Sequence, residues 1–225
     1  APVASQDEIG RLAATFNQMT GELQQTMAAL TRRTHMLATS AEVAQAASAS
    51  LELDQVLHTS VALICERFGY YHASVFLIEP GSDTAVLRES YGEVGAIFRK
   101  SGHQLHVGSQ SLVGQATASR QPYVAQNVAE DPMHFKHPLF PATRAEAVFP
   151  LLVGELVIGA LDVQSKRTDA FPPDVVALLQ TVANQVAVAV QHAWLHAEQI
   201  AVGERFAEAD RMKTQFLSNM SHELR

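Results

Sequence analysis

Residues 148–165 read VFPLLVGELVIGALDVQS, an apolar stretch divided in the middle by Gly154 and Glu155. Its two halves, 147–153 and 156–164, are rich in aliphatic and β-branched residues, which is typical of strands. A glycine that leads a two-residue loop favours a type II′ turn, because glycine adopts a positive φ without steric cost. The stretch therefore predicts a tight β-hairpin.

A second hairpin is predicted earlier in the chain. Residues 73–79 are rich in β-branched and aromatic residues and end in the turn former PGSD at 80–83, after which 86–91 reads as another strand. Between the two hairpins, residues 102–143 mix glycine, histidine and proline around a short helical stretch near 111–119. Such a segment is typical of loops that cover a pocket, so we expect ligand contacts there.

Helices are predicted on either side of these strands. Apolar residues at helical spacing predict a helix at 51–68, which Gly69 should end. A closing helix should begin near Asp174, and because no proline follows Pro173 before Arg225, this helix should continue to the end of the sequence. Its apolar stripe consists of Val175, Leu178, Leu179, Val182, Val186 and Val190.

The N-terminal segment has a seven-residue repeat. The interleaved position begins with Leu12 and Met19 and then becomes polar, as in a coiled coil with breaks that set its register. This pattern predicts a parallel homodimer, and the alternative is one long amphipathic helix packed on its own domain. The repeated position is apolar throughout: Ile9, Phe16, Leu23, Leu30, Leu37, Ala44 and Leu51.

Composition excludes some classes of function. The net charge is −7, from 23 acidic and 16 basic residues, and no basic run is present, so direct nucleic-acid binding is not expected. The single cysteine, Cys65, lies among apolar neighbours, which favours a small buried side chain in a reducing compartment. The most apolar stretch, 145–163, is interrupted by charged residues, proline and glycine, so it is not expected to span a membrane.

Two parts of the chain resemble signalling domains. DEIGRLAATFNQM at 7–19 resembles the second helix of a HAMP linker, which implies that this chain is the cytoplasmic portion of a membrane-anchored protein. SLVGQATASRQPYVAQNVAEDP at 111–132, the hairpin at 148–165 and LLQTVANQVAVAVQHA at 178–193 resemble a GAF domain. The GAF resemblance implies an α+β fold, an antiparallel sheet flanked by helices, with a pocket for an unknown small molecule under the loops at 102–143.

The last residues carry a third resemblance. FLSNMSHELR at 216–225 is similar to the phospho-acceptor box of histidine kinases, which implies that His222 accepts a phosphoryl group and that Glu223 orients the ring or accepts its proton. On an ideal helix His222 lies about 170° from the centre of the apolar stripe, so it is expected to face solvent. The alternative is a solvated surface histidine with no chemical role.

The resemblances divide the chain into three predicted parts. Residues 1–50 are the C-terminal HAMP helix and a coiled-coil linker, 51–196 the GAF sensor domain, and 197–225 a signalling helix and the start of the phospho-acceptor domain. Long N- and C-terminal coiled-coil helices thus flank the sensor domain.

Four other histidines were considered as metal ligands. His103 and His106 are three residues apart, as are His134 and His137, but no cysteine or clear carboxylate partner completes a site. No metal site is therefore predicted.

These observations predict the sensory and dimerisation portion of a two-component sensor histidine kinase. A signal in the GAF pocket would control autophosphorylation of His222, and the phosphoryl group would pass to the receiver domain of a response regulator. No glycine-rich nucleotide loop is visible, so ATP and Mg would bind a domain beyond Arg225, and this chain needs no cofactor and is inactive alone. The alternative is a non-catalytic GAF ligand-binding module that dimerises and regulates another output domain.

Overall fold

The computed structural model describes residues 8–48 and 50–223, and it describes side chains of the C-terminal helix as far as Thr214. Contacts along the chain define two compact units, Ala1–Ala41 and Glu42–Arg225.

The first unit consists of most of α1 (Glu8–Ser48), a helix of 41 residues whose last residues, from Glu42, belong to the second unit. The predicted seven-residue repeat lies on α1, apart from its last member, Leu51, which follows the end of the helix. The side chains of Ile9, Leu37 and Ala44 are outside the described set. Large apolar side chains along α1 are 59% to 71% exposed: Leu12, Phe16, Met19, Leu23, Met27 and Leu30.

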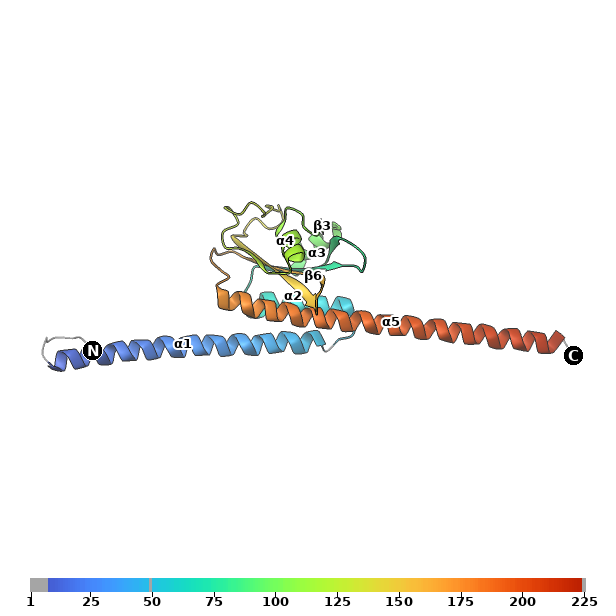
Figure 1. The fold of residues 1–225 in the computed structure, drawn as a ribbon, viewed down its shortest axis with the longest axis horizontal. Helices are drawn as coiled ribbons and strands as arrows, with labels where there is room; N and C mark the ends of the chain where they lie inside the picture. The colour runs from blue at the N-terminus through green and yellow to red at the C-terminus, as the bar shows by residue number, and fades with distance from the viewer. Residues whose placement is uncertain (1–7, 49, 224–225) are drawn as a thin grey trace. The chain divides into compact units, whose positions relative to one another are not determined.

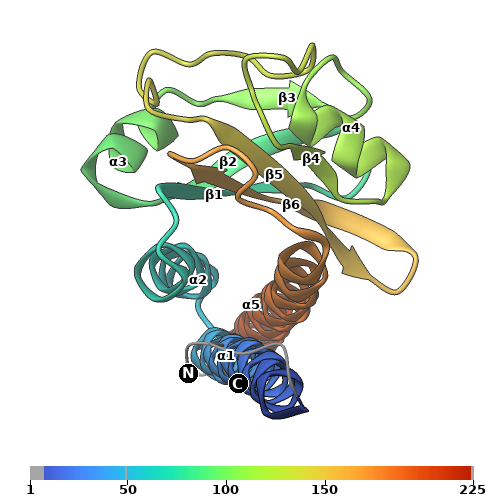
Figure 2. The same ribbon diagram turned by 90° about the vertical axis from the view of Figure 1, so that its left-hand side faces the viewer.

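The second unit contains a six-stranded sheet in the order β3-β2-β1-β6-β5-β4 (Figure 2). Every neighbouring pair of strands is antiparallel. The centre of the sheet pairs strands from opposite ends of the unit, since Phe76 lies opposite Ala160. The strands are β1 (His72–Ile78), β2 (Thr84–Ser90), β3 (Gln104–His106), β4 (Tyr123–Ala125), β5 (Ala145–Val153) and β6 (Leu156–Ser165).

Both predicted hairpins are confirmed. β5 pairs with β6 up to Val153 and Leu156, which leaves only Gly154 and Glu155 in the loop. Gly154 has a φ of 59°, the positive value that the first loop position of the predicted turn requires. β1 and β2 form the earlier hairpin. Local turn chemistry and strand propensity were thus sufficient to place these four strands.

Helices cover both faces of the sheet (Figure 1). α2 (Leu53–Phe68) and α5 (Pro173–Glu223) lie along one face, and the views agree that α4 (Leu112–Ser119) and the loops lie on the other. α2 ends, as predicted, at Gly69 with a left-handed φ of 72°. The helix α3 (Gly92–Lys100) was not predicted, and its short apolar pattern includes only Val94, Ile97 and Phe98 as large residues.

α5 is a continuous helix of 51 residues. Over Pro173–Thr214 it is long and apolar enough to cross a membrane by length and composition alone. Its first half nevertheless packs on the sheet, where Leu179, Val182 and Val186 are fully buried. This half of α5 therefore serves as a core helix of the second unit.

Gly159 in β6 lies close to the backbone of β1. A Cβ at this position would collide with the backbone carbonyl of Phe76 in β1. Only glycine therefore permits the central β1–β6 pairing at this point without a shift of the backbone.

Candidate ligand-binding site

A cavity of about 350 Å³ lies between the sheet and the segment 98–143. Its floor is formed by side chains of β1, β5 and β6, and its walls by side chains of α3, α4 and the loop before β5. The volume is at the lower end of the range of roughly 300–1,000 Å³ typical of small-molecule sites. The position is the one that the sequence analysis expected for a pocket under the loops at 102–143.

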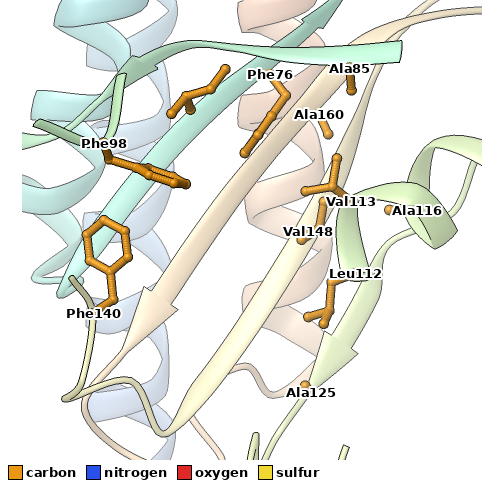
Figure 3. Packing of buried hydrophobic residues seen from close by; sticks show 11 residues of the cluster. Phe76, Ala85, Phe98, Leu112, Val113, Ala116, Ala125, Phe140, Val148 and Ala160 are labelled. Carbon is orange, nitrogen blue, oxygen red and sulfur yellow. The ribbon is translucent and has the colours of Figure 1, made fainter. Parts of the chain in front are cut away.

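One half of the cavity wall is aromatic. Figure 3 shows Phe98 of α3 and Phe140 of the loop beside one another, above the sheet that carries Phe76. The rings of Phe98 and Phe140 meet edge to face, with centroids 5.3 Å apart. His137 joins this group with its ring centroid 4.8 Å from that of Phe98. At the outer edge of the lining, Phe135 is 74% exposed.

The other half of the wall contains acidic side chains. Glu146 of β5 and Asp162 of β6 are 9% and 4% exposed, respectively. In the β5–β6 ladder Glu146 lies opposite Gln164, and Val148 lies opposite Asp162. Because alternate residues of a strand share a face, Glu146, Asp162 and Gln164 project from the same side of the sheet. All three line the cavity.

Burial changes the protonation of this acidic half. Desolvation raises the pKa of Glu146 to about 7. Desolvation, and next the charge of Glu146, raise the pKa of Asp162 well above its ordinary value. His134 Nδ1 lies 2.6 Å from Glu146 Oε2, while burial lowers the pKa of His134. Burial therefore favours protonation of this pair over two full negative charges.

The structure separates the histidines that are neighbours in the sequence. His106 lies on β3 with Nδ1 3.6 Å from Asp83 Oδ1, away from the cavity, whereas His103 lines it. The ring of His103 is 6.1 Å from that of His137, which comes from the other pair. Glu146 is the carboxylate partner of His134 that sequence reasoning did not find. Among the described residues, no group of three or more histidine, cysteine or carboxylate residues is arranged to hold a metal ion.

A further buried polar group lies beneath Phe140. His72 Nε2 is 2.9 Å from the hydroxyls of both Ser74 and Ser90, and its ring centroid is 4.1 Å from that of Phe140. Burial lowers the pKa of His72 to about 4, so this ring is neutral at physiological pH. The cluster is satisfied internally and supports Phe140 from below.

Two other features are less suited to binding. Cys65 is buried in α2, as predicted, and burial raises the pKa of its thiol to about 12, so the reactive thiolate is scarce. A second hollow, of about 390 Å³, lies between α5 and the sheet, where Leu156 and Leu195 are exposed. Its wall is mainly apolar and contains no buried charged side chain among the described residues.

The predicted phospho-acceptor segment lies at the end of α5. The backbones of His222 and Glu223 are helical, while their side chains lie outside the described set. Their predicted roles therefore stay predictions. α5 is nevertheless continuous from the sheet to this segment, with Gly203 accommodated in the helix.

Comparison with known proteins places the fold. The GAF domain of a phosphoenolpyruvate-protein phosphotransferase from Coxiella burnetii matches with a TM-score of 0.65 at 20% sequence identity, over 73% of this chain and 98% of that chain. A free methionine-R-sulfoxide reductase from Neisseria meningitidis matches at 0.61 and 21%, over 70% and 89%. The Nlh2 GAF domain of A. aeolicus matches at 0.61 and 14%, over 71% and 97%. At these identities the likeness establishes the fold alone.

Sequence profiles identify the family. The GAF domain profile matches residues 50–191, more than half of the chain, and the HAMP domain profile matches residues 1–25. Among curated proteins, none matches this chain. The resemblances to a HAMP linker and a GAF domain are thus confirmed, as is the predicted antiparallel sheet flanked by helices. The chain belongs to the GAF domain family and combines a GAF signal-sensing domain with a HAMP segment.

Proposed function

We propose that this chain is the sensory and dimerisation portion of a two-component sensor histidine kinase. The observation that carries the proposal is the segment FLSNMSHELR, which lies at the end of α5, a helix that runs without a break from the buried core of the GAF domain. In this proposal the GAF cavity is the input and His222, with Glu223 beside it, is the phospho-acceptor site. ATP and Mg would be supplied by a kinase domain beyond Arg225, and the receiver domain of a response regulator would accept the phosphoryl group.

The sheet offers a physical route from the cavity to α5. Glu146 faces the cavity, while its neighbours in β5, Ala147 and Phe149, are fully buried on the opposite side of the strand. There β5 packs on α5, and Gln180 Nε2 donates a hydrogen bond of 3.1 Å to the carbonyl of Pro150. A ligand that shifts β5 would therefore also shift α5, and a long helix transmits a tilt or rotation to its far end.

The same proposal includes a homodimer. The apolar stripe of α1 is exposed in a single chain, and its heptad spacing is that of a parallel coiled coil. Along α5 the residues Val188, Leu195 and Val202 follow one another at steps of seven and are 42% to 50% exposed. A second copy of the chain would cover both stripes. Light scattering at micromolar concentration should give twice the mass of the chain, and the mass of a monomer would contradict the dimer.

The HAMP match favours a membrane-linked parent protein. We therefore propose that the chain is the cytoplasmic portion of a membrane-anchored sensor, with the anchor before Ala1. No nucleic-acid partner is proposed, because the net charge of −7 opposes binding to phosphates.

The kinase assignment is tested by phosphoryl transfer. The chain is extended at Arg225 with the ATP-binding domain of a histidine kinase and incubated with labelled ATP and Mg. We expect acid-labile labelling that His222→Gln abolishes, because glutamine has a similar size but no nucleophilic nitrogen. The matched control is His192→Gln, which removes an exposed histidine from the same helix and should leave labelling intact. Undiminished labelling of the His222→Gln variant would remove His222 from the mechanism.

A non-catalytic output is the second candidate. The GAF fold, the cavity and the coiled-coil stripes fit a ligand-controlled dimerisation module for any output domain, and only FLSNMSHELR distinguishes the kinase. The sequence of the parent protein beyond Arg225 discriminates the two. An ATP-binding kinase domain there supports the first candidate, and another type of output domain supports the second.

A further inference from the structure

The cavity contains a buried carboxylate oxygen that no N–H or hydroxyl group of the described residues reaches. Within the described part of the chain, Asp162 Oδ1 has no hydrogen-bond donor. Thr143 Oγ1 donates to Gln164 Oε1 at 2.7 Å, and this contact orients the amide of Gln164 so that Nε2 donates to Asp162 Oδ2 at 3.0 Å. The protein therefore provides a permanent donor for one oxygen of Asp162, while the only further hydrogen bond of this carboxyl is the one that it shares with Glu146 when one of the two acids is protonated. Once that proton is lost, a buried acceptor is left without a donor, which is costly and favours a ligand that donates.

The electrostatics of the cavity favour a donor that carries positive charge. Asp162 has a second buried carboxyl, Glu146, beside it on the same face of the sheet. Among the described residues that line the cavity, none is a lysine or an arginine. The closest basic group is His134, whose contact with Glu146 Oε2 uses only one carboxylate oxygen. Two carboxyls in a poorly hydrated site without a fixed cation attract a cationic ligand.

The remainder of the cavity suits an apolar body. Phe98 and Phe140 form an edge-to-face wall, and Phe76 contributes to the floor. Exposed Phe135 lies at the outer edge of the same lining. Aromatic faces attract both apolar groups and organic cations. The acidic and aromatic halves together define a site with one polar end.

We propose that the cavity binds a small organic cation in which a primary ammonium or an amidinium group is attached to an apolar or aromatic body. The cationic N–H groups donate to Asp162 Oδ1 and to Glu146, and the body lies against Phe98 and Phe140. This inference rests on the sensory part of the proposed function, since it names the class of ligand that the GAF domain detects. It does not depend on the kinase output.

Proton competition gives the proposed site a characteristic pH dependence. Because burial raises the pKa of Glu146 to about 7, acidification protonates the pair and removes the charge that attracts the cation. Protonation of nearby histidines would also repel the cation, so it too would lower the affinity at acidic pH. The affinity for an amine should therefore rise with pH between 6 and 8, by up to about tenfold per pH unit for one proton released. The titratable groups around the pair are His134, Asp131, His103 and His137.

The experiment uses matched ligands with the same body and different charge. The 225-residue chain is titrated by calorimetry and by amide NMR shifts with 2-phenylethylamine, 2-phenylethanol and phenylacetate, and with the equivalent triples built on butyl and indolylethyl bodies. We expect at least one amine to bind at pH 7.5, at least tenfold more tightly than its alcohol and carboxylate counterparts, with shifts at the cavity residues. Amines that show no binding at millimolar concentration would overturn the proposal, as would an alcohol or carboxylate that binds equally well.

Variants locate the binding in the acidic half. Asp162→Asn should weaken amine binding at least tenfold, and Glu146→Gln should weaken it and flatten its pH dependence. The matched control is Glu155→Gln, a carboxylate outside the cavity that is 98% exposed and should change neither property. Thermal unfolding checks that the variants fold, and if Asp162→Asn does not, Glu146→Gln and the pH profile of the natural chain decide. Unchanged amine affinity in folded Asp162→Asn would overturn the proposal.

The outcomes separate this inference from the proposed function. Binding of neutral or anionic compounds in the same cavity would be consistent with the sensory role and would contradict only the proposal that the ligand is a cation. Amine binding together with undiminished phosphoryl labelling of His222→Gln would leave the cation site intact and remove the kinase assignment.

Discussion

The two central strands β5 and β6 bury different kinds of side chain on their two faces. Toward α2 and α5 they bury apolar residues without interruption: Ala147, Phe149, Leu151, Leu161 and Val163 are fully buried. On the opposite face they bury Glu146, Asp162 and Gln164 beside the apolar Val148 and Ala160, and they border a cavity of about 350 Å³. The side chains of a strand alternate between these faces, so consecutive residues of β5 and β6 point in turn toward the helices and toward the cavity.

We infer that the face toward α2 and α5 contributes mainly to stability and that the face that borders the cavity contributes to ligand binding. A close-packed apolar face gains free energy from burial and dispersion at every residue. The cavity face leaves space unfilled and holds carboxyls out of water, which costs stability unless a ligand compensates. The polar residues of the cavity are therefore better explained by binding than by folding.

The largest expected effect is the loss of a side chain from the helix face. Phe149→Ala should lower the free energy of unfolding by roughly 3–5 kcal/mol, because the fully buried ring would leave a cavity in close-packed surroundings. The matched variant on the other face is Phe98→Ala, expected to cost about 2 kcal/mol, because this ring already borders a cavity and has fewer neighbours to lose. Urea denaturation measures both values. Equal losses would mean that the two faces do not differ in packing.

A smaller effect is expected from the buried acid. The folded state holds a proton on Glu146 between the ordinary carboxyl pKa and about 7, whereas the unfolded chain has released it. This group therefore makes the free energy of unfolding fall as pH rises through that window, by up to about 1.4 kcal/mol per pH unit. Glu146→Gln should flatten this dependence. The free energy of unfolding of the variant should therefore rise relative to that of the natural chain between pH 5 and pH 7.5.

The buried His72 changes the free energy of unfolding with pH in the opposite direction. Because burial lowers the pKa of His72 to about 4, its contribution to stability is present above pH 6.5 and is lost as pH falls toward 4. The difference between the natural chain and Glu146→Gln cancels this histidine term, which is common to both. Denaturation curves at several pH values measure the slopes, and parallel slopes would contradict a raised pKa for Glu146.

The smallest expected effect concerns the helix that closes the cavity. Ser111 caps α4 through a hydrogen bond of 3.0 Å from the backbone N–H of Gly114. Ser111→Ala should cost about 1 kcal/mol of stability, the usual value for an N-cap. Ser119→Ala, at the other end of the same helix, should have a smaller effect. Thermal unfolding measures both, and equal stabilities would show that the cap contributes little.

The hairpins and the closing helix were predictable because their signals are local. The loop at Gly154 and the strands on either side lie within a few residues of each other, and turn chemistry fixes their pairing. The helix from Pro173 follows from apolar spacing and the absence of proline. The strands β3 and β4 have only three residues each, too few for a periodic pattern, and α3 contains only three large apolar residues, so none of these elements was predicted.

The histidines show where local reasoning is insufficient. Spacing grouped His103 with His106 and His134 with His137, but the fold brings His103 to His137 and His134 to Glu146. A strand or an extended loop turns neighbouring side chains in different directions, so closeness in sequence does not mean closeness in space. The carboxylate partner of His134 lies on another strand, where no local pattern marks it.

The sequence by itself determined the two hairpins, the long helices, the GAF and HAMP resemblances and the expectation of a pocket beneath the central loops. Periodicity and turn chemistry depend on residues a few positions apart, so one sequence is enough to show them. Only the tertiary structure decided the acidic pair of the cavity. Antiparallel pairing of β5 with β6 places Glu146 beside Asp162, and burial of both gives these carboxyls properties that neither has in the unfolded chain.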